Sequence, residues 1–140
     1  MKQSILLDTG PLVAFLNRKD KYHKWAVAQW GQISPPMLTC EAVVSEACFL
    51  LTGTAAGGDS VMQLIQRQII STSFRLDENI LPVRKLLAKY RSVPMALADA
   101  CLVRMSELHQ NGRVLTLDSD FNIYRKEGRR IIPTIMPSAE

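Results

Sequence analysis

The sequence predicts an α/β fold in which a mainly parallel sheet is covered by helices on both faces. Short apolar segments alternate along the chain with longer segments whose apolar residues recur every three or four positions, which is the spacing of a helix. The chain has 140 residues, of which 47% are hydrophobic and 21% charged, and this balance excludes disordered and collagen-like chains. Its length suits one core, so we expect a single domain over residues 1–140.

Five short segments have the composition of strands. The first is an apolar run that ends abruptly at Asp8, and the last is expected at an edge of the sheet because Pro133 cannot continue a central ladder. In chain order, the expected strands cover residues 5–7, 37–39, 69–76, 114–117 and 131–132.

Helices are expected between these strands. Pro35 and Pro36 end the second helix, Gly53 follows the third, and Asn111-Gly112 ends the last as a C-terminal cap. The expected helices cover residues 11–17, 21–32, 41–51, 60–68, 78–90 and 95–110.

Cysteine content and hydropathy bear on the cellular compartment. Cys40, Cys48 and Cys101 lie among apolar neighbours and form no C-x-x-C pair, which is typical of buried, reduced thiols. No apolar run reaches 18 residues, so we expect no signal peptide, no membrane span and a cytoplasmic protein. The net charge of +4 permits a phosphate-rich partner without requiring one.

Four acidic residues have apolar sequence neighbours, unlike acidic residues on a solvated face. Asp8 and Asp118 each follow an apolar strand, and Glu46 and Asp99 lie in helices with apolar residues three and four positions away. Because the carboxyl ends of parallel strands gather at one edge of a sheet, we expect these four side chains to meet there.

Each of these residues also has a structural interpretation. Asp8 and Asp118 have the positions of turn or helix-cap residues, and Asp99 can serve the dipole of its helix. Glu46 could be paired with an arginine, since burying it alone costs several kcal/mol.

If the four carboxylates converge, their chemistry points to a divalent cation. Carboxylates within about 4–6 Å raise each other's pKa, so a cluster at neutral pH needs protons or a metal. An all-oxygen ligand set suits Mg²⁺ or Mn²⁺ and not Zn²⁺, and such a metal supports phosphodiester hydrolysis. Asp120 is either a further ligand or a surface turn residue.

The same residues resemble a known family over nearly the whole chain. The matching segments are ILLDTGPLVA at residues 5–14, the helix with Glu46, MALADA at 95–100 and LTLDSDF at 115–121. In order and spacing they resemble the PIN domain, specifically the small single-domain VapC-like toxins.

The resemblance implies a Rossmann-like sheet in the order 3-2-1-4-5 and a ribonuclease site that depends on Mg²⁺ or Mn²⁺. It makes Asp8, Glu46, Asp99 and Asp118 the catalytic and metal-binding quartet, with Asp120 as an additional ligand candidate and Thr9 and Thr116 as polar neighbours. Family members commonly form homodimers, and the toxins are inhibited by a small antitoxin that covers the active-site groove. The resemblance leaves open whether this chain is a toxin.

Two groups of basic residues are candidates for binding RNA, although either could be a solvated face. Tyr22 and Tyr124 are candidates for stacking on unpaired bases, whereas Trp25 and Trp30 suit the core or a dimer interface. The basic groups are Arg18, Lys19, Lys21 and Lys24, and Arg125, Lys126, Arg129 and Arg130.

The alternative function is a PIN-like module that binds nucleic acid or protein without significant catalysis. Such a module would be expected to lack at least one of the four acids, and none is replaced here. Phosphoryl-transfer domains of the haloacid dehalogenase type fit poorly, since they need an acid two residues after the first aspartate, where this chain has Gly10.

Overall fold

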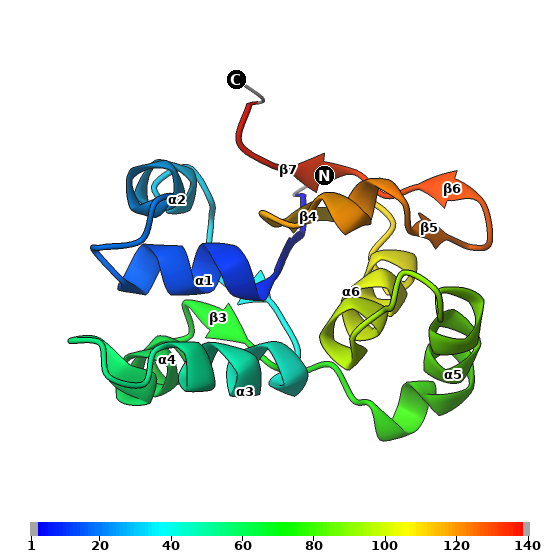
Figure 1. The fold of residues 1–140 in the computed structure, drawn as a ribbon, viewed down its shortest axis with the longest axis horizontal. Helices are drawn as coiled ribbons and strands as arrows, with labels where there is room; N and C mark the ends of the chain where they lie inside the picture. Colours follow the sequence, from blue (N-terminus) through cyan, green and yellow to red (C-terminus); the bar gives the residue numbers. More distant parts are fainter. Residues whose placement is uncertain (1–2, 139–140) are drawn as a thin grey trace.

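The computed structural model describes residues 3–138, which form an α/β domain around a five-stranded parallel sheet (Figure 1). The strand order is β3-β2-β1-β4-β7, and all four neighbouring pairs are parallel. This confirms the expected order, because β7 is the fifth strand of the sheet along the chain. The strands are β1 (Ile5–Leu7), β2 (Met37–Leu38), β3 (Ile70–Ser71), β4 (Arg113–Leu115) and β7 (Thr134–Ile135).

The expected second and fourth strands, 37–39 and 114–117, extend past the observed ends of β2 and β4 at Leu38 and Leu115, and two other strand predictions were wrong by more. The third strand was expected over residues 69–76 but ends at Ser71, because its neighbour β2 stops at Leu38 and leaves later residues without a partner strand. The last strand was expected at residues 131–132, yet the edge strand begins after Pro133, whose carbonyl accepts a hydrogen bond from Val114 N at 2.9 Å. Proline can accept such a bond although it cannot donate one.

The residues just before Pro133 belong instead to a small antiparallel hairpin. Strand β5 (Arg125–Lys126) pairs with β6 (Arg130–Ile131) in a two-stranded sheet of its own. Strand β5 also packs against the last long helix. The basic segment that follows Tyr124 is therefore a folded element.

Six helices connect the strands, at positions close to those expected. Pro11 is tolerated in the first turn of α1, where its missing N–H would be unpaired in any case. Helix α4 begins at Gly57, three residues before the expected start. The helices are α1 (Thr9–Leu16), α2 (His23–Trp30), α3 (Glu41–Leu50), α4 (Gly57–Gln66), α5 (Ile80–Lys89) and α6 (Leu97–Leu108), with 3₁₀ turns η1 (Asp77–Asn79) and η2 (Ser119–Asn122).

The strands β1 and β4 lie inside the sheet and are buried in the core. Leu6, Leu7, Val114 and Leu115 have no exposed surface. In Figure 1, helices α1, α2 and α4 lie to one side of β1, and α5 and α6 lie to the other. The chain crosses from one face to the other between β3 and β4, so the point where the strand order reverses falls at β1 and β4, where α/β folds bind their ligands.

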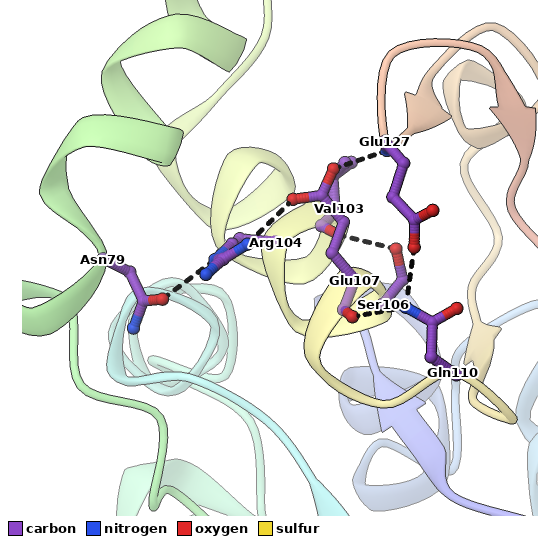
Figure 2. A network of polar contacts seen from close by, with 7 residues as sticks. All are labelled: Asn79, Val103, Arg104, Ser106, Glu107, Gln110 and Glu127. Carbon is purple, nitrogen blue, oxygen red and sulfur yellow. Dashed lines mark hydrogen bonds and ion pairs between the residues drawn. The ribbon is translucent and has the colours of Figure 1, made fainter.

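Glu107 of α6 connects this helix, through hydrogen bonds, to the hairpin and to the turn η1 before α5 (Figure 2). One of its oxygens accepts a hydrogen bond from Glu127 N at 2.6 Å, and the other accepts one from the Arg104 guanidinium at 3.2 Å. Arg104 Nε in turn donates to Asn79 Oδ1 at 2.9 Å, and Gln110 bonds Glu127 Oε1 at 2.6 Å. This chain of contacts holds three separate segments in one position.

Two further expectations concern the cysteines and membranes. The three cysteines are free; Cys40 and Cys101 are buried, whereas Cys48 is half-buried. None of the helices in residues 3–138 has the length and apolar character needed to cross a membrane.

Candidate metal and active site

Asp8 is fixed in position by contacts on both of its carboxylate oxygens. Its backbone N–H still pairs with Leu115 O at 3.0 Å, so the residue closes strand β1 before helix α1 begins. Oδ1 accepts a hydrogen bond from Thr9 N at 2.8 Å, and Oδ2 accepts one from Thr116 Oγ1 at 2.6 Å. Asp8 is therefore an N-cap of α1, as the structural interpretation held, and it also lines the cavity described below.

Thr116 and Asp118 continue this arrangement from the end of β4. The Thr116 hydroxyl donates to Asp8 and accepts a hydrogen bond from Asp118 N at 2.9 Å. Asp118 Oδ1 accepts one from Asp120 N at 2.9 Å, which makes Asp118 the cap of η2. A continuous line of hydrogen bonds thus links the ends of β1 and β4 across two buried side chains, Asp8 and Thr116.

The four predicted acids line one cavity of about 250 Å³ at the carboxyl ends of β1 and β4. Asp8 and Asp118 enter it from the strand ends, Glu46 from α3, and Asp99 from the first turn of α6. The full lining is Asp8, Thr9, Gly10, Glu46, Leu50, Asp99, Leu117 and Asp118. The four side chains therefore line the same cavity, and their catalytic and metal-binding roles stay a prediction.

The carboxylates of this cavity have no cationic partner in the part of the chain that the structure describes. Within residues 3–138, the ion pairs are Arg75–Asp77, Arg104–Glu107 and Arg130–Glu127, and none of them involves an acid of the cavity. Glu46 is exposed and has no arginine partner among the described residues, so the expectation that it would be buried was wrong, although its side chain still lines the cavity. Among the described residues, no side chain forms an ion pair with a carboxylate of the cavity.

Burial and mutual repulsion raise the pKa of two of these groups. Burial raises the pKa of Asp8 to about 6, against the lowering effect of hydrogen bonds from Thr116 and Thr9, and the charges of Asp99 and Asp118 add to the rise. The pKa of Asp99 is also raised, first by burial and then by Asp118, Glu46 and Asp120, while the Tyr124 hydroxyl opposes the rise. The carboxylates thus influence one another electrostatically, as a shared site requires.

Asp120 and Tyr124 both lie near the cavity, and Tyr124 differs from what the sequence indicated. Asp120 is half-buried beside the cavity, and its carboxylate is not part of the lining. Tyr124 was a candidate for stacking on bases, but it is fully buried and its hydroxyl donates to Asp99 Oδ2 at 2.9 Å. No local sequence pattern indicated this contact, because Asp99 lies 25 residues earlier in the chain.

The first basic group is exposed but lies at the far end of α1 from Asp8. Its members follow the last turn of a helix of eight residues, which is about 12 Å long. All four side chains face solvent: Arg18, Lys19, Lys21 and Lys24.

The second basic group is largely occupied within the protein. The Arg125 guanidinium donates to three backbone carbonyls, and Arg130 pairs with Glu127 at 3.2 Å. Lys126 is only 2% exposed, so its prediction as a surface contact to RNA was wrong, because β5 folds against α6. Arg129 is exposed.

The donor chemistry of the cavity fits a hard divalent cation. Its ligand atoms are all oxygens, which suit Mg²⁺ or Mn²⁺. Thr9 also lines the cavity; its hydroxyl is buried and, among the described residues, has no hydrogen-bond partner. As the side chains lie, no three His, Cys, Asp or Glu groups of residues 3–138 are spaced to hold one ion, so binding would require the repelling carboxylates to move closer together.

The protein has a parallel sheet flanked by helices and an acid-lined cavity at the point where the strand order reverses. These features are typical of α/β domains that bind a ligand at the carboxyl ends of their strands. A family model described as PIN domain matches residues 5–127, and the chain belongs to this family. The fold is similar to that of VapC20 of Mycobacterium tuberculosis, described as a sarcin-ricin loop cleaving toxin, with a TM-score of 0.73 and 20% sequence identity over 86% of this chain and 94% of that chain. No curated protein matches the chain.

Proposed function

We propose that this protein is an endoribonuclease that depends on Mg²⁺ or Mn²⁺. The observation that carries the proposal is the cavity in which Asp8, Glu46, Asp99 and Asp118 gather without any cationic partner among the described residues. Membership of the PIN family and a fold similar to an RNA-cleaving toxin support RNA as the substrate. These four residues would hold the metal, with Thr9 and Thr116 as accessory polar groups and Asp120 beside them.

In this proposal the protein supplies orientation and charge. The Thr9 N–H and the Thr116 hydroxyl hold both oxygens of Asp8, so this carboxylate has one orientation at the floor of the cavity. The Thr9 hydroxyl, which is buried and has no partner among the described residues, would orient a water or a phosphate oxygen once the side chains rearrange around a metal. A bound metal would supply a more acidic water as nucleophile and neutralise the phosphate charge.

The exposed basic residues support RNA binding at a distance from the cavity. Arg18, Lys19, Lys21 and Lys24 are free to contact phosphates, and Arg129 can do so from the hairpin. Such contacts position a strand without reading its sequence.

The narrower form of the proposal is that the protein is a toxin that acts in the cytoplasm as a homodimer and is inhibited by a separate antitoxin. Its support is the similarity to VapC20 and, for the reducing compartment, the three free cysteines.

The experiment measures cleavage of a mixed RNA pool with Mn²⁺, with EDTA, and by Asp8→Asn. With Mn²⁺ we expect cleavage by the wild type and by the control Asp59→Asn, and we expect none by Asp8→Asn or in EDTA. Asp59→Asn is the control, because Asp59 is an exposed carboxylate on α4 that accepts a hydrogen bond from Gln63 and does not line the cavity. Cleavage that survives both EDTA and Asp8→Asn in a folded protein would refute the proposal.

A second candidate function is a binding module without catalysis. It is favoured by the spacing of the carboxylates, which do not form a ready-made metal site as they lie. RNA binding that neither needs Mn²⁺ nor leads to cleavage would identify this function.

A further inference from the structure

Tyr124 lies between the aromatic core and the acidic cavity. Its side chain is fully buried, and its ring makes edge-on contacts with Tyr90 and Phe121 at centroid distances of 5.1 and 5.3 Å. A buried tyrosine hydroxyl needs a hydrogen-bond partner. Here the partner is Asp99 Oδ2, at 2.9 Å.

The backbone that carries Tyr124 is fixed from two sides. Tyr124 N donates to the Asp120 carbonyl at 3.1 Å. The Arg125 guanidinium donates to the carbonyls of Asn122, Ile123 and Tyr124 at 2.7, 3.2 and 3.0 Å. The ring and its backbone are thus both held, so the hydroxyl has a single direction.

The neighbouring Tyr90 shows that aromatic packing alone does not require this contact. Tyr90 is also buried and belongs to the same ring cluster, but its hydroxyl accepts a hydrogen bond from Arg125 N at 2.9 Å. Of these two tyrosines, Tyr124 is therefore the one whose hydroxyl reaches a carboxylate of the cavity.

Asp99 has one oxygen engaged and one without a hydrogen-bond partner among the described residues. Oδ2 accepts the Tyr124 hydroxyl, whereas no contact within residues 3–138 occupies Oδ1. Asp99 also experiences the negative charges of Asp118 and Glu46, which would push a freely rotating carboxylate away from the cavity. A neutral hydroxyl donor holds such a group in place without neutralising it.

We propose that Tyr124 is a positioning residue: its hydroxyl fixes one oxygen of Asp99 so that the carboxylate stays directed at the acidic cavity with its other oxygen available to a divalent cation. The inference rests on the proposed function for the identity of the ligand. Outer partners of metal ligands typically contribute 10–100-fold to metal affinity or activity.

The test compares Tyr124→Phe with Tyr90→Phe, its matched control. Each variant removes one hydroxyl from the same ring cluster, but only the first removes a contact to Asp99. Titration with Mn²⁺ followed by electron paramagnetic resonance is expected to show about 10–100-fold weaker binding for Tyr124→Phe. Binding by Tyr90→Phe should equal that of the wild type. Equal weakening by both variants, or none by Tyr124→Phe, would overturn the inference.

A double-mutant cycle separates positioning from a general effect on stability. If Tyr124 acts through Asp99, adding Tyr124→Phe to Asp99→Ala should cause no further loss of Mn²⁺ affinity. An additional loss equal to that seen in the wild-type background would show that Tyr124 does not act through Asp99.

A metal-free measurement distinguishes this inference from the proposed function. The carboxyl ¹³C resonance of Asp99, assigned by its absence in Asp99→Ala, should move in Tyr124→Phe and not in Tyr90→Phe. If the wild type binds no Mn²⁺ and the resonance moves, the proposed function is refuted while the positioning of Asp99 stands. An unmoved resonance overturns the positioning itself.

Discussion

Replacing Asp8 by Asn should make the metal-free protein more stable at neutral pH. Asp8 is 6% exposed, and burial raises its pKa from 3.8 to about 6. Since one pKa unit corresponds to about 1.36 kcal/mol, keeping this carboxyl ionised in the folded state costs about 3 kcal/mol. An asparagine has no charge to bury and so avoids this cost.

The hydrogen bonds of Asp8 reduce the expected gain. The Asn carbonyl can accept from Thr9 N, and its amide can donate to Thr116 Oγ1, but a bond from a hydroxyl to a charged acceptor is lost. A loss of about 1 kcal/mol leaves a net gain of about 2 kcal/mol for Asp8→Asn at pH 8.

The stability gained by Asp8→Asn should increase as pH rises. Between pH 3.8 and about 6 the folded protein holds more protons at Asp8 than the unfolded chain does, so wild-type stability falls as pH rises through this window. The cost is complete above the folded pKa and small at pH 4, where the two proteins should differ by less than about 1 kcal/mol.

Urea unfolding in EDTA at pH 4 and pH 8 measures the free energy of unfolding of the wild type and of Asp8→Asn. The pKa values of Asp77 and Glu127 are lowered, by Arg75 and by Gln110 with Arg130, which favours folding at higher pH, but these effects are common to both proteins and cancel. Two results would contradict this reasoning: Asp8→Asn being less stable than the wild type at pH 8, or a stability difference that does not change with pH. Either result would mean that the buried charge of Asp8 does not destabilise the folded protein.

Three further outcomes follow. Mn²⁺ at a hundred times its dissociation constant should stabilise the wild type by about 2.7 kcal/mol and leave Asp8→Asn unchanged in a thermal shift assay; equal shifts would place the ion elsewhere. Glu107→Ala removes the acceptor of Glu127 N and Arg104 and should cost about 1–3 kcal/mol in urea unfolding, and a smaller cost would mean that the hairpin is held by other contacts. Gly112→Ala puts a Cβ 2.9 Å from the His109 carbonyl oxygen and should cost about 1–3 kcal/mol, whereas Gly31→Ala, with its nearest atom at 3.5 Å, should be close to neutral; similar costs would contradict the steric argument.

The sequence allowed the four acids to be found because their neighbours are informative. Asp8 and Asp118 interrupt apolar strands, and Glu46 and Asp99 have apolar residues three and four positions away, so their sequence neighbours differ from those of a typical surface carboxylate. For Glu46 this pattern did not indicate burial, because the structure leaves its side chain exposed. The parallel topology then brings strand ends to one edge, which is why a local pattern predicted a tertiary cluster.

Other features depend on partners that local patterns do not contain. The edge strand β7 pairs with β4, whereas residues 130–131 pair with β5 in a separate sheet. The composition of residues 130–131 indicated a strand but did not indicate which strand would be its neighbour. Lys126 is one of several basic residues in its segment, and only the packing of β5 against α6 buries it. Tyr124 was similarly unpredictable, because its partner Asp99 lies 25 residues earlier in the chain.

The most direct test of the central claim is the Mn²⁺-dependent rate of RNA cleavage by four variants, Asp8→Asn, Glu46→Gln, Asp99→Asn and Asp118→Asn, beside the exposed control Glu78→Gln. Because metal-assisted charge stabilisation contributes several kcal/mol, each site variant should lose about a hundredfold or more in rate while Glu78→Gln matches the wild type. Full activity in two or more folded site variants would contradict a shared metal site built from these carboxylates.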